Sequence, residues 1–183
     1  DGVAVGPTIG GYYNANVYLN GGPSDITVEY FGGEAGYTNY FKWDGNTLFT
    51  HTGGSTDIDT IAPVGQAVGS QIVNSVPSGL LPFLFATSGG LSVANGSNIP
   101  NDNNTFPNFF VSFDTSEIAA GGPTSGQFVY LFFDDGGAEN DDNHDDMLVK
   151  LSVTGGSFSV PDASSTLLLL SIGVCSLIGL RRK

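Results

Sequence analysis

The stretch "FVYLFFDDGGAENDDNHDDMLVKLSV", residues 128–153, decides the fold class. Residues 128–133 are apolar on both faces, as is typical of a central strand that is covered on both sides. Positions 147, 149, 151 and 153 are apolar, and the residues between them include Lys150 and Ser152, a period of two that indicates a half-buried strand. The thirteen residues between these segments hold seven carboxylates, so the stretch predicts two strands joined by an acidic loop.

Short segments with the same two-residue period recur along the chain between Gly-Gly pairs, where glycine's tolerance of positive φ allows a reversal. They predict further strands at 12–19, 26–30, 38–43, 47–51, 66–73, 91–94 and 109–113. The segment 80–86 is apolar on both faces, as residues 128–133 are, and predicts another strand. Pro82 places the segment 80–86 at an edge or a bulge, because proline donates no hydrogen bond to a ladder. The pattern predicts an all-β fold, an antiparallel β-sandwich or jelly-roll-like domain over residues 1–154.

Charge is distributed very unevenly. The formal net charge is −13, and only Lys42 and Lys150 are basic before residue 181. Such a surface repels nucleic acid and attracts cations, so we expect no nucleic-acid partner. Cys175 is the only cysteine, which excludes an intrachain disulfide. The sequence starts at Asp1 rather than at a methionine, from which we expect that a secretory signal has been removed.

The C-terminal segment differs in character from the rest. We expect residues 155–165 to be a linker and residues 166–183 to form a hydrophobic α-helix with a basic end. The uncharged run 166–180 would span about 22 Å as a helix, against about 30 Å for a membrane core, and outward-reaching basic side chains can make up the difference. The alternative is a buried core helix. The residues expected to contact lipid or a neighbouring helix are Leu167, Leu170, Gly173, Leu177, Leu180, Arg181 and Arg182.

This tail resembles the PEP-CTERM class of sorting signals, and especially its Val-Pro-Asp variant. The matching parts are Val160, Pro161 and Asp162, small polar residues at 163–166, the apolar run 167–180 and the basic end 181–183. Asp162-Ala163 stands where the commoner form has Glu-Pro. The acidic hairpin and "AGYTNYFKW", residues 35–43, are similar to segments of exported bacterial proteins with such tails. The resemblance implies export, a helix initially in the inner membrane, processing by an exosortase-type enzyme, and a place at the cell surface or in the extracellular matrix.

The acidic loop is the candidate site. Carboxylates crowded on a short segment repel one another unless a cation compensates or some of them are protonated. Oxygen donors at this density suit Ca²⁺. The donors we expect are Asp134, Asp135, Asp141, Asn143 and Asp145, with Asp142 and Asp146 as alternates. The loop is not an EF-hand, because Asp146 stands at the glycine position and Ser152 at the final glutamate position.

Two other interpretations of this loop remain open. It could be a solvated acidic loop that keeps the protein soluble, or His144 among the carboxylates could indicate zinc or catalysis. The only other histidine is His51, and neither lies in a sequence pattern that supports a nucleophile and base. We therefore expect no enzymatic activity.

The function expected from these features is that of a non-enzymatic structural subunit of a bacterial cell-surface or matrix assembly, stabilised by Ca²⁺. Small residues of the tail and open strand edges would allow it to self-associate into a filament or sheath. The alternative is a calcium-dependent carbohydrate-binding or adhesion module for an extracellular polysaccharide. Its stacking platform would consist of Tyr12, Tyr13, Tyr37, Tyr40 and Trp43.

Overall fold

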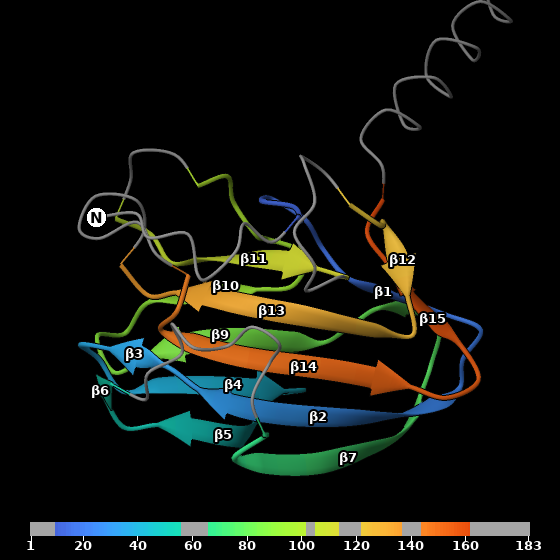
Figure 1. The fold of residues 1–183 in the computed structure, drawn as a ribbon, viewed down its shortest axis with the longest axis horizontal. Coiled ribbons are helices and arrows are strands. Elements are labelled where there is room, and N and C mark those ends of the chain that lie inside the picture. Colours follow the sequence, from blue (N-terminus) through green and yellow to red (C-terminus); the bar gives the residue numbers. More distant parts are fainter. Residues whose placement is uncertain (1–9, 56–65, 102–104, 114–121, 137–143, 162–183) are drawn as a thin grey trace, which may run out of the picture.

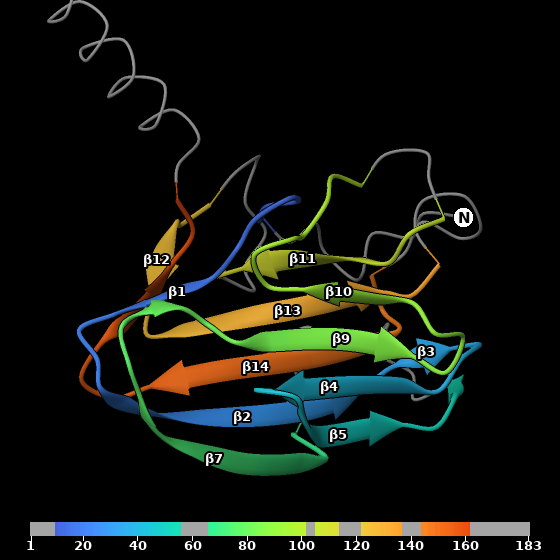
Figure 2. The ribbon, with the colours of Figure 1, turned by 180° about the vertical axis from the view of Figure 1, so that it is seen from behind.

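The computed structural model describes residues 10–55, 66–101, 105–113, 122–136 and 144–161, and in these ranges every strand pairs antiparallel with its neighbours. Figures 1 and 2 show two sheets that lie one behind the other. The larger sheet has the order β11 (Asn108–Ser112), β13 (Phe128–Asp134), β14 (Met147–Val153), β2 (Ser24–Gly32) and β7 (Gly69–Val76). The second has the order β10 (Ser92–Ala94), β9 (Phe83–Thr87), β4 (Asn39–Trp43) and β5 (Asn46–His51).

Two smaller sheets extend this pair. One contains β12 (Ser125–Gly126), β15 (Ser157–Ser159), β1 (Tyr18–Asn20) and β8 (Gly79–Leu80), and the other contains β3 (Glu34–Ala35) and β6 (Gly54–Ser55). The chain passes from the larger sheet to the second between β2 and β4, and returns between β5 and β7. The strands of each sheet therefore come from distant parts of the sequence.

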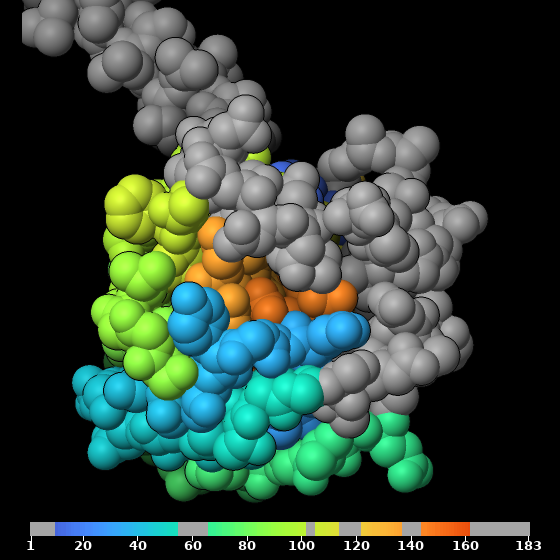
Figure 3. Space-filling model, turned by 90° about the vertical axis from the view of Figure 1, so that its left-hand side faces the viewer, coloured from blue at the N-terminus to red at the C-terminus, as the bar shows by residue number. Residues whose placement is uncertain are grey.

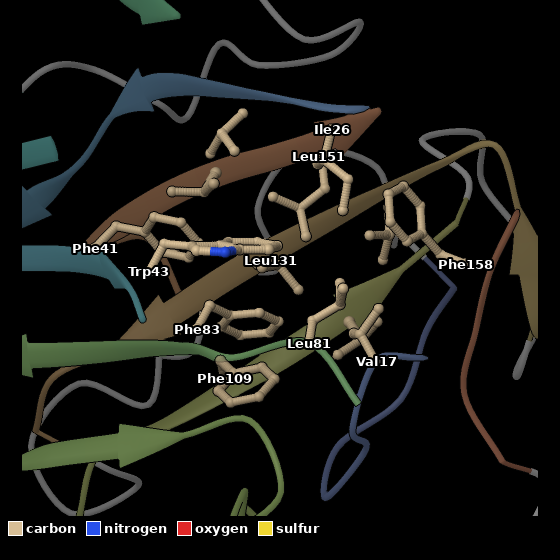
Figure 4. Packing of buried hydrophobic residues seen from close by; sticks show 14 of the residues in the cluster. Val17, Ile26, Phe41, Trp43, Leu81, Phe83, Phe109, Leu131, Leu151 and Phe158 are labelled. Carbon is tan, nitrogen blue, oxygen red and sulfur yellow. The ribbon is translucent and has the colours of Figure 1, made fainter. Parts of the chain in front are cut away.

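The hydrophobic core lies between the two sheets because alternate side chains of each strand point inward. The rings of Phe85 on β9 and Phe133 on β13 stack across the interface with centroids 4.6 Å apart. Figure 4 shows Phe83, Phe109 and Leu131 pointing into the same interior. Each fully buried side chain of this size stabilises the fold by about 1.5–3 kcal/mol relative to an exposed one. Packing between the sheets therefore holds both strands that flank the acidic loop.

The predicted all-β antiparallel architecture is confirmed, including β13 and β14 on either side of the acidic loop. The assignment of Pro82 to an edge or bulged strand is wrong. β9 begins at Phe83 and lies between β10 and β4, so Pro82 precedes the strand and removes no ladder hydrogen bond. The carbonyl of Pro82 accepts a hydrogen bond from the Asp44 amide at 2.8 Å.

The sheet also continues beyond residue 154. Residues 157–159, which we assigned to the linker, form β15 between β12 and β1, and Phe158 is fully buried. The alternation of Ser157, Phe158, Ser159 and Val160 carries the signal for this strand. The predicted C-terminal helix at 166–183 lies outside the described residues.

Candidate functional site

The two ends of the acidic loop are buried rather than solvated. Asp134, Asp135, Asp145 and Asp146 are only 0%, 6%, 5% and 5% exposed. Asp134 ends β13 and Asp135 follows it, whereas Asp145 and Asp146 precede β14, where Phe133 pairs with Met147. Figure 3 views this rim, where orange residues at the ends of β13 and β14 lie between light blue residues that follow β2 and green residues of the second sheet. The described part of the loop is therefore built into the fold, contrary to the solvated-loop interpretation.

Local hydrogen bonds fix these carboxylates. The Asp146 amide donates to the carbonyl of Phe133 at 3.1 Å, which closes the β13–β14 ladder. The Asp135 amide donates to Oδ2 of Asp146 at 2.7 Å, and the Gly136 amide donates to Oδ1 of Asp134 at 2.9 Å. The Glu34 amide donates to the carbonyl of Asp145 at 2.8 Å. The carboxylates of Asp134 and Asp146 are thus held by amides that follow β13, and the carbonyl of Asp145 is held by an amide of β3.

Asn39, on β4 of the opposite sheet, joins this group. Its Nδ2 donates to Oδ2 of Asp135 at 2.7 Å and to the carbonyl of Asp146 at 3.4 Å. The side chain is fully buried, and its Oδ1 accepts no hydrogen bond from any part of the chain that the structure describes. A buried amide oxygen without a donor is costly in a native protein, and an amide oxygen is also a ligand that Ca²⁺ accepts.

The electrostatic environment disfavours full ionisation of the group. Burial, together with the neighbouring carboxylates of Asp135, Asp134 and Asp145, raises the pKa of Asp146 to about 9, although the hydrogen bond from the Asp135 amide opposes the shift. Lys150, the lysine nearest to the loop in sequence, forms an ion pair with Glu29 at 3.0 Å. Without a cation, Asp146 therefore holds a proton at neutral pH.

His144 lies beside this group without forming a metal triad among the described residues. Its Nε2 is 2.7 Å from Oδ1 of Asn108, an acceptor, so Nε2 carries the proton. The Asn108 amide donates in turn to Oδ1 of Asn101 at 3.3 Å. Within the ranges that the structure describes, no three His, Cys, Asp or Glu side chains form a cluster able to hold a metal ion. A calcium site here therefore needs further oxygen donors, and Asp141, Asp142 and Asn143 lie outside the described residues.

Gly33 is a residue of this site that the sequence analysis missed. It lies between β2 and β3, and a Cβ at this position would overlap the backbone carbonyl of Asp146. Only glycine permits the β2–β3 segment to approach the end of the hairpin so closely. In the sequence, only the Gly-Gly pair at 32–33 marks this position. Such a pair indicates a reversal of the chain as readily as a close approach of two backbone segments.

We expect Gly33→Ala to lower the free energy of unfolding by about 2–3 kcal/mol, because the clash is with backbone and cannot be relieved by a side-chain rotation. Gly36→Ala is the matched control, since a Cβ there meets nothing within 4 Å. Urea unfolding of both variants measures the difference. Equal stability of the two variants would show that the hairpin end is not packed as described.

The five aromatic residues expected to form a stacking platform do not share a surface. Trp43 is buried in the core, with its ring 6.5 Å from that of Phe83. Tyr13 contacts Phe110 of the larger sheet. Tyr37 lies against Gly89, beyond β9 of the second sheet. The remaining two, Tyr12 and Tyr40, are half-buried. Trp43 cannot stack on a ligand without unfolding the core.

The sorting motif starts inside the folded body. Val160 is buried, and its amide donates to the carbonyl of Thr124 at 2.9 Å. Pro161 is exposed. Asp162 and the predicted helix residues Leu167, Leu170, Gly173, Leu177, Leu180, Arg181 and Arg182 lie outside the described residues. Over the residues that the structure describes, there is no helix long and apolar enough to cross a membrane.

Comparison with known families identifies the tail. Residues 159–183 match the model of the VPDSG-CTERM motif, a variant of the PEP-CTERM type of sorting signal. The resemblance stated from Val160, Pro161 and Asp162 is thereby confirmed. Such a signal indicates an exported protein of the cell surface and implies membrane anchoring and processing by an exosortase-type enzyme. No curated protein matches the chain.

Proposed function

We propose that the chain is a non-enzymatic structural subunit of a bacterial cell-surface or extracellular matrix assembly, in which Ca²⁺ bound by the acidic hairpin stabilises the β-sandwich. The observation that carries the proposal is the sorting signal at residues 159–183, which directs the chain to the surface. In the residues that the structure describes, the body that carries this signal is a β-sandwich with four buried aspartates at one rim.

The calcium part of the proposal is supported by burial and donor chemistry. Four carboxylates at most 6% exposed are costly to ionise together, and a divalent cation removes that cost. Of the expected donors Asp134, Asp135 and Asp145, at most two would supply carboxylate oxygens to one ion, since no three carboxylates of the described residues form a metal-binding cluster. Asn39 would supply the amide oxygen that lacks a donor. Asp141 and Asn143 would complete the shell from the loop. Calcium concentrations outside cells are high enough for sites of modest affinity.

The absence of enzymatic activity is supported by the environment of both histidines. Nδ1 of His51 is 2.7 Å from the hydroxyl of Tyr30, and its Nε2 is 3.3 Å from the carbonyl of Gly54. His144 donates to Asn108. Both rings are engaged in hydrogen bonds that join strands and loops, as is typical of structural histidines.

The double variant Pro161→Ala/Asp162→Ala tests the proposed destination without touching the core, because Val160 remains in place. In a host with an exosortase-type enzyme, we expect the wild-type chain to be accessible to external protease and to have lost its tail. The double variant should keep the tail and remain in the inner-membrane fraction. Cell fractionation with mass measurement distinguishes the two forms. Surface exposure and processing of the double variant at the wild-type level would contradict the proposal.

A further inference from the structure

The larger sheet has one long open edge, at β7. This strand of eight residues ends the order β11-β13-β14-β2-β7, and within the described residues it pairs only with β2. Figures 1 and 2 show β7 at the lower margin of the molecule in both views. An edge strand presents unpaired amide and carbonyl groups and is a template for another strand.

The other long edges of the sandwich are partly occupied. At the opposite end of the larger sheet, Tyr12 and Val111 exchange two backbone hydrogen bonds of 2.8 and 3.0 Å, which covers part of β11. On the second sheet, the Gln71 side chain donates to the carbonyl of Leu48 on β5 at 2.7 Å. β7 therefore offers the longest run of backbone for pairing.

The first part of β7, before the register shift at residues 74–75, lacks the charged and proline residues that protect natural edge strands from pairing. No residue from 60 to 101 is charged, in a chain whose net charge is −13. Side chains on β7 and immediately before it are exposed and apolar: Ile72 is 62% exposed and Val68 is 67% exposed. Lysines, prolines and inward-pointing charges are the usual protection, and residues 69–76 contain none of them. On the neighbouring β2, Glu29 forms an ion pair with Lys150, and the exposed Asp25 accepts a hydrogen bond from the Ser75 amide at the irregular end of β7.

We infer that β7 is the interface through which two copies of this chain associate, by antiparallel pairing of β7 with β7 about a two-fold axis. The charge distribution indicates that the partner strand belongs to a second copy of this chain. Two copies with 18 acidic residues each repel one another over most of their surface, and the uncharged edge is where they can approach. The inference rests on the proposed function as a surface assembly subunit and identifies the contact from which the assembly is built.

The strand is self-complementary in the register centred on Ile72. In this register Ile72 faces its own copy, and Ser70 faces Asn74 on either side. Apolar contact at the axis with neutral hydrogen-bonding groups beside it buries no charge. The positive φ of Ser75 (56°) and Pro77 end the regular part of the strand, which limits the pairing to a short two-fold segment. Pairing of this kind closes after two copies, so a filament would need a second contact.

Disulfide trapping in the full chain tests this arrangement. In a Cys175→Ser background, Ile72→Cys places two thiols on the axis, where opposite Cα atoms of an antiparallel pair are about 4.5–5.5 Å apart, within the range that disulfides bridge. Leu91→Cys is the control, since Leu91 is also apolar and is 41% exposed but lies between β9 and β10. In mild detergent we expect Ile72→Cys to form the disulfide-linked dimer roughly tenfold faster than Leu91→Cys. Association through the tail would crosslink both variants alike.

Lysine substitutions give a second readout that needs no cysteine. Ile72→Lys places like charges on the axis and should give a monomer at concentrations where Leu91→Lys, with the same net charge, remains dimeric. A mixture of Ile72→Lys and Ile72→Glu should associate again.

The inference is overturned if Ile72→Cys and Leu91→Cys crosslink at equal rates, or if Ile72→Lys leaves the oligomeric state unchanged. A monomeric chain that still reaches the cell surface and loses its tail would overturn this inference while leaving the proposed function intact.

Discussion

Replacing Asp146 with asparagine is expected to stabilise the body by about 2–4 kcal/mol at pH 7 in the presence of a chelator. Asp146 is 5% exposed and lies among three other buried aspartates. Asparagine has nearly the same shape as aspartate and carries no charge. It also keeps an oxygen that can accept the hydrogen bond from the Asp135 amide. Most substitutions destabilise a native protein, so the direction of the change is a specific test of the crowding.

The direction of this change in stability follows from the raised pKa of Asp146. Burial, followed by the neighbouring carboxylates, raises the pKa of Asp146 from its ordinary value of 3.8 to about 9. The folded chain therefore keeps a proton that the unfolded chain releases, and the free energy of unfolding falls as pH rises from about 4 to about 9. Asp146→Asn should flatten this decline. Urea unfolding at pH 5 and pH 8 measures how the free energy of unfolding changes with pH. The wild type and Asp146→Asn are compared, both in a form that ends at Pro161.

A matched control separates this effect from the general reduction of negative charge. Asp44 is exposed and has a positive φ of 46°, a conformation that asparagine also tolerates, so Asp44→Asn removes one charge without strain. We expect Asp44→Asn not to reproduce the gain in the free energy of unfolding at pH 7 in chelator. If Asp146→Asn instead destabilised the body at pH 7 in chelator, Asp146 would be ionised and stabilised by its surroundings.

Calcium is expected to raise the melting temperature of the body by about 5–10 °C at a concentration of about 100 times the dissociation constant. At that concentration a ligand of the folded state alone contributes about 2.7 kcal/mol. The double variant Asp135→Asn/Asp145→Asn should abolish the rise, because it removes two of the buried carboxylates. A double variant at exposed positions, Asp44→Asn/Asp25→Asn, removes the same amount of charge. Calcium should still raise the melting temperature of this variant. Identical melting curves in calcium and in chelator would exclude a site.

The sequence predicted most of the strands because burial of one face imposes a period of two. The segments before and after the acidic loop, 128–133 and 147–153, became β13 and β14 almost to the residue. Pro82 misled the prediction because proline rules apply only within a ladder, and the start of β9 at Phe83 was not visible in a continuous apolar run. β15 was missed because its three residues follow a Gly-Gly pair and precede a motif that marks a tail.

The candidate site was predicted only in part. The density of acids identified Asp134, Asp135 and Asp145, since charge density is a property of the sequence alone. Their burial was not predictable, because the cover comes from segments far along the chain. Asn39 lies about a hundred residues away on the opposite sheet, and nothing in its neighbours distinguishes it from other asparagines. Long-range contacts of this kind are fixed by sheet packing rather than by local pattern.

We propose that a cation takes the place of the proton among the buried aspartates. Calorimetric titration of the body with calcium at pH 7, in two buffers that differ in their heat of protonation, measures both the binding and the proton released. We expect saturable binding with release of about one proton per ion, because a bound cation lowers the pKa of Asp146 below neutrality. Asp135→Asn/Asp145→Asn should abolish the binding. No saturable binding, or binding that exchanges no proton and survives the double substitution, would show that no cation replaces this proton.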